Sequence, residues 1–299
     1  MSDLSPHNGI LVGADGSPCS KTAVQWAARA AAMRNVPLTV VVVFRPVDGW
    51  SGTVLSMVPF PEDIGQMQEA EGRRIIEDAI EIVNATTRDS GRLQVSSEVL
   101  WSPPVPTLVD LTKEAQMIVV GCRGRGALSR GLLGSVSTAL VHHAHCPVAV
   151  IHDDAPRPPS FAHAPVLVGV DGVSASELAT AIAFDEASWR GVDLVALHTL
   201  SDADWPDLPH IKWSAVKAAA DEALAERLAG WQERYPHVTV RRVVEYAYPA
   251  RHLLREAESA QLVVVGNRGR GGFAGMLLGS VSTAVVYGAH TPVIVVRQR

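Results

Sequence analysis

A glycine-rich pattern of the kind that cradles phosphate occurs twice in the chain. The first copy reads GCRG at 121–124 and continues to GSVST at 134–138. The second copy, GNRG at 266–269 followed by GSVST at 279–283, lies 145 residues later. Glycine lets a backbone approach an anion closely, and the unpaired N–H groups and positive dipole end of a following helix favour negative charge. The pattern therefore predicts one phosphate-binding cradle in each half of the chain.

The elements around each copy suit that chemistry. Apolar, strand-like runs at 116–120 and 262–265 precede the glycines, and helix-like segments begin at Ser135 and Ser280. An earlier apolar run in each half ends in an aspartate, Asp15 or Asp171. Ligands of open α/β sheets bind where the carboxyl ends of neighbouring strands meet and the strand order reverses. We therefore expect each aspartate to lie close to the glycines of its own half.

The whole chain reads as a tandem repeat. ILVGADGS at 10–17 matches VLVGVDGV at 166–173, and a length of 299 residues suits about two domains. The stretch between the halves is rich in proline and lacks apolar periodicity, so it reads as a linker. We predict a first domain over 1–152, a linker over 153–165 and a second domain over 166–299.

Short β-branched runs alternate with longer helical patterns in each half. In the first half the expected strands are Ile10–Ala14, Leu38–Phe44, Gln94–Leu100, Met117–Cys122 and Val148–Ile151. Ser17 and Pro18 form a good N-cap and first-turn pair for a helix over Pro18–Arg34. Strands with helices between them predict an α/β fold with two tandem, doubly wound, parallel five-stranded sheets of Rossmann-like type.

Composition excludes several classes of protein. A net charge of −5 gives no electrostatic reason to expect nucleic acid as a partner. No run approaches the 18 or so apolar residues of a membrane span, and the first residues do not resemble a signal peptide, so we expect neither membrane insertion nor secretion. Cys19, Cys122 and Cys146 show neither CxxC spacing nor even pairing, which argues against zinc and disulfide frameworks and favours the cytoplasm.

Two other groups of residues have a functional and a simpler explanation. Arginines within or beside the glycine pattern could screen phosphate charge, although loop arginines are more often simply solvated; they are Arg123, Arg125, Arg130, Arg268 and Arg270. The histidines at 142, 143 and 145 resemble a metal cluster, but they fit the end of a helix better and have no carboxylate or cysteine at ligand spacing. We therefore expect no protein-bound metal.

Together, the strand-ending aspartate and two copies of G-x2-G-x9-G-S are similar to the ATP-binding class of the universal stress protein family, in its tandem two-domain, mycobacterial-type form. The resemblance covers essentially the whole chain and implies an adenine nucleotide α-hydrolase-like fold, ATP, with Mg²⁺ held through the phosphates, and a role in stress response. The residues that it implies as nucleotide contacts are Gly13, Ala14, Asp15, Val43, Gly121, Gly124, Gly134, Ser135, Val136, Ser137, Gly169, Val170, Asp171, Thr199, Gly266, Gly269, Gly279, Ser280, Val281 and Ser282.

Within that set the resemblance implies a division of labour. The aspartates, with Val43 and Thr199 on the second strands, would hold adenine and ribose. The GxxG glycines would border the ribose and phosphates, and the GSVS residues would hold the polyphosphate through backbone N–H and hydroxyl groups.

No lysine-bearing P-loop, acidic metal cluster or GxSxG nucleophile motif occurs in the sequence. We therefore expect no catalytic residues, at most weak ATPase activity, and a nucleotide-dependent stress sensor or regulator with one ATP site per half. Two alternatives stay open. One is a slow ATPase or adenylyl-transfer enzyme, although the SGGxDS-type loop of such enzymes is missing. The other is a nucleotide-free scaffold that binds an unidentified protein through 48–63 and 201–213.

Assembly follows from the last apolar segments, CPVAVI and TPVIVV. In the family that this chain resembles, the equivalent strand commonly pairs lobes across a two-fold axis. We expect the halves to form an internal pseudo-dimer and the chain to form a homodimer.

Overall fold

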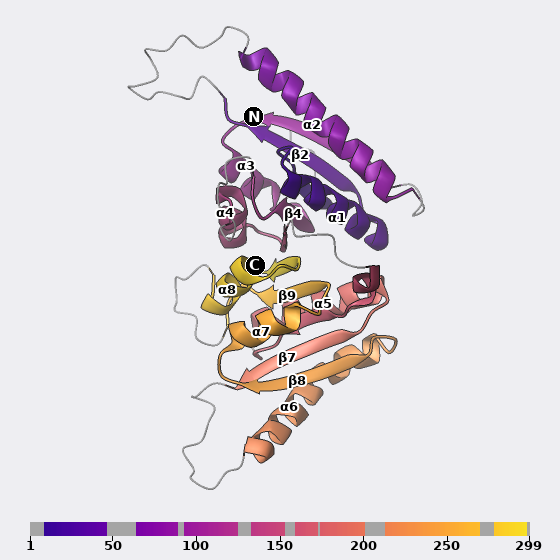
Figure 1. The fold of residues 1–299 in the computed structure, drawn as a ribbon, viewed down its shortest axis with the longest axis vertical. Helices are drawn as coiled ribbons and strands as arrows, with labels where there is room; N and C mark the ends of the chain where they lie inside the picture. Colours follow the sequence, from indigo (N-terminus) through magenta and orange to yellow (C-terminus); the bar gives the residue numbers. More distant parts are fainter. Residues whose placement is uncertain are drawn as a thin grey trace, which may run out of the picture. The chain divides into compact units, whose positions relative to one another are not determined.

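The computed structural model describes residues 9–46, 64–88, 93–124, 133–152, 159–172, 174–200, 213–269 and 278–297. The chain divides into two compact units, Met1–Asp153 and Asp154–Arg299, called unit 1 and unit 2 below. Both units alternate strands with helices (Figure 1). The expected partner loops at 48–63 and 201–213 lie outside the described residues, apart from Trp213.

Unit 1 is a parallel sheet covered by helices on both faces. Its elements are β1 (Ile10–Gly13), α1 (Pro18–Arg34), β2 (Leu38–Phe44), α2 (Ile64–Thr86), β3 (Val95–Trp101), α3 (Pro104–Leu111), β4 (Met117–Gly121), α4 (Ser135–His143) and β5 (Val148–Ile151). The strand order is β3-β2-β1-β4-β5, with every pair parallel. Right-handed crossovers then require α1 and α2 on one face and α3 and α4 on the other, as Figure 1 shows.

Unit 2 repeats this arrangement. Its elements are a 3-10 helix (Pro159–His163), β6 (Val166–Gly169), α5 (Ser174–Arg190), β7 (Leu194–Leu200), α6 (Trp213–Arg234), β8 (Val240–Tyr246), α7 (Pro249–Ala257), β9 (Leu262–Gly266), α8 (Ser280–Gly288) and β10 (Val293–Val296). The strands are again parallel, in the order β8-β7-β6-β9-β10. The predicted fold class, two doubly wound parallel sheets of five strands, is confirmed.

The central strands are buried on both faces, which explains their apolar runs. All four residues of β5 and of β10 are buried, as are Met117–Val120 of β4. Helix α1 packs on β1 and β4 through a stripe of alanines that includes Ala23, Ala27 and Ala30, each fully buried. Because alanine is small, α1 approaches the sheet closely, and its first turn is held against the end of β4.

Local signals placed α1 correctly. The helix begins at Pro18, and the Ser17 hydroxyl accepts a hydrogen bond of 3.2 Å from the backbone N–H of Ser20. Helices α4 and α8 also begin at Ser135 and Ser280, as the sequence predicts. The division between the units falls at the start of the predicted linker, but the proposed domain boundaries themselves stay a prediction.

Candidate nucleotide site

Strands β1 and β4 lie side by side while the chain leaves them in opposite directions along the sheet. In open α/β sheets this reversal leaves a crevice at the carboxyl ends of the strands. The loop that begins at Ala14 leaves β1 there, and the loop that begins at Cys122 leaves β4 beside it. Strands β6 and β9 create the same arrangement in unit 2.

The aspartate of each unit lies against the second glycine of the GxxG pattern. In unit 1, Asp15 Oδ1 accepts a hydrogen bond of 3.0 Å from the Ser17 N–H. Its other oxygen, Oδ2, would be 2.5 Å from a Cβ placed on Gly124. In unit 2, a Cβ on Gly269 would be 2.7 Å from Asp171 Oδ2. The predicted proximity of aspartate and glycines is therefore present in both units, and a glycine is what permits it.

Helices α4 and α8 begin without a capping side chain. Their N-cap residues, Gly134 and Gly279, are extended, with φ of −69° and −72°. The first N–H groups of any helix lack an intrahelical acceptor. A Cβ on Gly134 would point at the Gly124 backbone, 3.5 Å from its nitrogen, so the lack of a side chain keeps the space between the two glycine segments clear. This geometry offers backbone donors at the positive end of a helix to an anion.

The serines of the GSVS segments divide into two kinds. Ser137 and Ser282 are buried, and their hydroxyls donate to the carbonyls of Cys122 (3.0 Å) and Gly266 (2.5 Å). Ser135 and Ser280, two residues earlier, are exposed, and Val136 and Val281 are half-buried. The expected hydroxyl donors to polyphosphate therefore narrow to Ser135 and Ser280, while Ser137 and Ser282 fasten the helix to the end of the strand.

The remaining predicted contacts lie at the same edge of the sheets. The N–H groups of Ala14 and Val170 donate to the carbonyls of Val41 and Leu197, at 2.9 and 2.8 Å. Val43 and Thr199 follow two residues after those carbonyls, and both are half-buried. Gly13 and Gly169 end β1 and β6, and Gly121 and Gly266 end β4 and β9. The structure thus brings the predicted residues of each unit together around one crevice.

Unit 2 contains two polar residues that the sequence did not single out. The guanidinium of Arg227, on α6, occupies the space above Gly172, where Nη1 would be 1.8 Å from a Cβ, and Gly172 has φ of +81°. The buried ring of His198 places Nδ1 2.7 Å from the Val170 carbonyl, so this nitrogen carries the proton. Neither residue has a local motif: they reach the loop from α6 and β7, and only the fold reveals them.

The arginines of the pattern take different positions. The Arg123 carbonyl accepts from the Ser17 hydroxyl at 3.4 Å, and hydrogen bonding to Cys122 raises the pKa of the Arg123 guanidinium. In unit 2, Arg268 is exposed. The pKa of Arg297 is lowered, mainly because its own guanidinium is partly buried and also because the positive charge of Arg268 is near. Two guanidinium groups near one another favour an anion there. Arg125, Arg130 and Arg270 lie outside the described residues.

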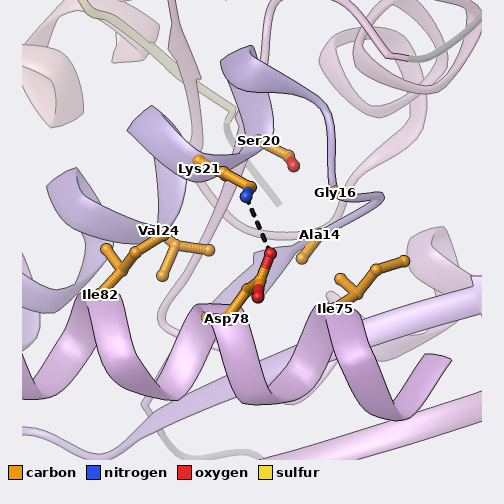
Figure 2. A pocket seen from close by; sticks show the side chains of 9 residues that line it. Ala14, Gly16, Ser20, Lys21, Val24, Ile75, Asp78 and Ile82 are labelled. Atoms are coloured by element: carbon orange, nitrogen blue, oxygen red, sulfur yellow. Dashed lines mark hydrogen bonds and ion pairs between the residues drawn. The ribbon is translucent and has the colours of Figure 1, made fainter. Parts of the chain in front are cut away.

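A separate small hollow, with a volume of about 10 Å³, lies between α1 and α2 (Figure 2). Ala14, Gly16 and Ile75 line one end of it, and Val24 and Ile82 line the other (Figure 2). The ion pair between Lys21 Nζ and Asp78 Oδ2, 2.8 Å long, spans it (Figure 2). A volume of about 10 Å³ is far below the roughly 300–1,000 Å³ of most ligand pockets, so we place the nucleotide on the glycine segments and not here.

The described ranges bear on two further expectations, metal binding and membrane crossing. Within them, no three His, Cys, Asp or Glu side chains gather closely enough to hold a metal ion. The rings of His142 and His143 have centroids 6.2 Å apart at the end of α4. None of the helices in the same ranges combines the length and the apolarity that a membrane crossing needs.

Comparison with known proteins decides the family. The sequence model described as "Universal stress protein family" matches residues 7–152 and again residues 163–297. The chain belongs to the universal stress protein family. It is a tandem member, because the two matches are consecutive and together span nearly all of it.

Two relatives from Mycobacterium tuberculosis resemble this universal stress protein over its full length. Universal stress protein Rv2005c is 54% identical over 299 residues, which cover 100% of both chains. Universal stress protein Rv2623 is 53% identical, covering 100% of this chain and 99% of the relative. Among solved structures, a universal stress protein from Archaeoglobus fulgidus aligns with a TM-score of 0.71 at 20% identity, covering 99% of this chain and 100% of that one. That last likeness supports the fold alone.

Proposed function

We propose that this universal stress protein binds one ATP in each unit and acts as a nucleotide-dependent stress-response regulator with little or no catalysis. The proposal includes a cytoplasmic location and a homodimer of the tandem chain. ATP binding would favour the conformation of the protein that binds the nucleotide best, and a protein partner would recognise that conformation.

One observation carries the proposal: the contact between aspartate and glycine stands beside a glycine-capped helix in both units. Asp15 with Gly124 and Asp171 with Gly269 approach within similar distances, 2.5 and 2.7 Å to the Cβ positions, although the two halves differ at many neighbouring residues. The chain preserves an acceptor for ribose hydroxyls next to a backbone donor set for phosphate. This combination suits a nucleotide better than either a sugar or inorganic phosphate.

The residues present fit ATP and do not require a protein-held metal. The N–H groups of the first turn of α4, with the Ser135 hydroxyl, would face the phosphates. Asp15 would accept from the ribose. Mg²⁺ prefers phosphate oxygens and water when few carboxylates are at hand, so it would enter with ATP. In unit 2, Arg227 and Arg268 would add positive charge near the polyphosphate.

Slow turnover follows from the positions of the nearest polar groups. Lys21, the lysine on the first turns of α1, is paired with Asp78 at 2.8 Å and faces α2 (Figure 2). One Asp15 oxygen already accepts from the Ser17 N–H. Neither group is placed to activate a water molecule at a γ-phosphate, so binding without hydrolysis is the expected behaviour.

The test is the nucleotide stoichiometry of the full chain. We expect about two ATP molecules per chain by calorimetry with Mg-ATP, and one after either Asp15→Ala or Asp171→Ala, because each removes the ribose acceptor of one unit. Asp110→Ala is the matched control, since this exposed aspartate on α3 pairs only with the exposed Lys113 at 2.7 Å among the ion pairs described. If the unaltered chain binds no ATP, the proposal is wrong and the nucleotide-free scaffold is the remaining interpretation. Steady release of ADP would favour the enzyme.

A further inference from the structure

Two cysteine side chains meet at the edge of the candidate site in unit 1. The sulfur atoms of Cys19 and Cys122 are 3.5 Å apart although the residues are 103 positions apart in sequence. Both residues are buried, with 5% and 4% of their surface exposed, and both thiols are free. Spacing along the chain gives no hint of this contact, because it depends on α1 packing against the end of β4.

The backbones hold the two thiols together. A Cβ on Gly121 would be 2.7 Å from the carbonyl carbon and 2.8 Å from the Cβ of Cys19, so only glycine permits this approach. The hydroxyl of Ser17 adds a second link to the same strand end, through the Arg123 carbonyl at 3.4 Å. The pair therefore joins two rigid elements and does not lie on a mobile surface.

The pair belongs to unit 1 alone. The repeat places Ala175 opposite Cys19 and Asn267 opposite Cys122, so the second glycine pattern has no thiol at either position. The third cysteine, Cys146, is buried before β5, where its sulfur lies 3.5 Å from the carbonyl of Pro147. Unit 2 therefore serves as an internal comparison, because it has no thiol at the two equivalent positions.

We propose that Cys19 and Cys122 form a reversible disulfide when the protein meets a peroxide-class oxidant, and that this modification is confined to unit 1. A disulfide has sulfur atoms about 2.05 Å apart. The two thiols therefore need to approach by about 1.5 Å, a movement of the size that side-chain rotation and small backbone shifts supply.

The chemistry balances with one peroxide. One sulfur, as thiolate, attacks a peroxide oxygen: an S–O bond forms, the O–O bond breaks, and the departing hydroxide takes up the thiol proton to become water. The second sulfur then attacks the resulting sulfenic acid. The S–S bond forms, the S–O bond breaks, and hydroxide with the second thiol proton gives another water. The two sulfurs lose two electrons and the peroxide gains them. Two external thiol groups reduce the disulfide by exchange: they release both cysteines as thiols and are themselves oxidised to a disulfide.

The surroundings slow the reaction of the pair with oxidant. Burial, with a smaller contribution from the neighbouring Cys122, raises the pKa of Cys19 to about 11, and Arg123 opposes that rise. A protonated thiol is a weak nucleophile. Cys122, and to a smaller extent Cys19, raises the pKa of the Arg123 guanidinium, so this cation is close enough to stabilise a thiolate when one forms.

The experiment treats the reduced full chain, free of nucleotide, with a small molar excess of hydrogen peroxide. Free thiols are then alkylated under denaturing conditions, and intact mass and peptide maps are recorded. We expect the chain to lose two hydrogen atoms, peptides containing Cys19 and Cys122 to be linked, and Cys146 alone to be alkylated. Treatment with dithiothreitol should restore three alkylated cysteines.

The variants copy what unit 2 already contains. Cys19→Ala and Cys122→Asn should each abolish the linked peptides, whereas Cys146→Ala should retain them, with circular dichroism checking that each variant folds. Three alkylated cysteines after peroxide, oxygen added to Cys19 or Cys122 without linkage, or a link that involves Cys146 would each overturn the proposal. The peptide map of the unaltered chain decides the matter even if a variant fails to fold, and the result does not depend on whether ATP binds.

Discussion

Three glycines of the first pattern serve three different purposes. Gly121 is required by packing, because a side chain there would meet the backbone of Cys19 at 2.7 Å. Gly124 is required by Asp15, whose carboxylate occupies the place of a Cβ. Gly134 has no contact closer than 3.5 Å at its Cβ position, so the free protein would accept alanine there. Packing therefore does not require a glycine at position 134, and we expect the missing side chain there to leave room for a ligand.

Gly124→Ala should weaken ATP binding in unit 1 by at least about tenfold, which corresponds to roughly 1.4 kcal/mol. The added Cβ would lie 2.5 Å from Asp15 Oδ2, and the carboxylate, as the flexible partner, would turn away from the crevice. Calorimetry on the full chain should then show one strong and one weakened site.

Gly65→Ala is the control for that change, because a Cβ at Gly65 meets nothing within 4 Å. Two sites of unchanged affinity in Gly124→Ala would mean that Asp15 does not contact the nucleotide. Gly269→Ala should weaken the other site for the same reason, with a clash at 2.7 Å.

At this scale the sequence predicted which residues gather around the crevice but not what their side chains do. Two glycine patterns and two aspartates are visible in the letters themselves. The hydrogen bond from the Ser137 hydroxyl to the Cys122 carbonyl cannot be predicted from the sequence, because it depends on how α4 turns after Gly134. Arg227 was missed because the distance between α6 and the loop at Gly172 is set by the fold.

Among the elements, the first helix of unit 1 differs from the last helix of each unit. Helix α1 is capped by the Ser17 hydroxyl, whereas α4 and α8 begin at glycines that supply no side chain. A serine cap in place of a glycine is worth only a few tenths of a kcal/mol. The site thus leaves helix donors available at little expense of stability.

Gly230→Ala should stabilise unit 2 by about 0.5–1 kcal/mol, because glycine in the middle of a helix has more backbone freedom to lose on folding. Gly230 is exposed on α6, and a Cβ there meets nothing within 4 Å. Urea denaturation of the full chain would measure the change.

Gly191→Ala is a matched contrast to it. This glycine also has open space around its Cβ position, but its φ is +62°, in the left-handed region. Alanine there should destabilise the protein by about 1 kcal/mol. If both alanines shifted the midpoint in the same direction, backbone conformation would not be the cause.

The helices and strands of this protein were easier to predict from the sequence than the contacts of its side chains. The bounds of α1 and β2 follow directly from the Ser17–Pro18 pair and from the β-branched run LTVVVVF. Strand ends were less accurate: the sequence extended β1 to Ala14, but the ladder with β2 ends at Gly13, because the chain turns there toward Asp15. Apolar letters continue past the last ladder residue, so periodicity cannot locate such a turn.

At the scale of the whole molecule, duplication has left two similar crevices with different surroundings. Unit 1 has the Cys19–Cys122 contact, and unit 2 has Arg227 and the neighbouring Arg268 and Arg297. One chain can therefore respond to two conditions separately if both crevices bind the same nucleotide.

Oxidation should change ATP affinity in unit 1 and leave unit 2 unaffected; this prediction rests on both the nucleotide site and the disulfide. Drawing Cys19 and Cys122 together moves the first turn of α1 against the strand end that carries Gly124 and thus shifts Asp15 relative to the glycines. Calorimetry on peroxide-treated chain should show a several-fold change in one of two sites. If the isotherms are identical before and after oxidation, in protein whose mass shows the disulfide, then the disulfide forms without changing the affinity for ATP.

The hydrogen bonds at the base of each glycine loop have a consequence for divergence among related proteins. The N–H of Gly134 donates to the Cys122 carbonyl at 2.8 Å, and the N–H of Gly279 donates to that of Asn267 at 2.7 Å. Each of these hydrogen bonds joins the residue after the strand to the residue that caps the helix, and so closes the base of the loop. For a flexible segment, doubling its length adds only about 0.6 kcal/mol to the cost of closure. Descendants of one ancestral gene can therefore differ in the number of residues between the two bonded positions, while the crevice is inherited intact.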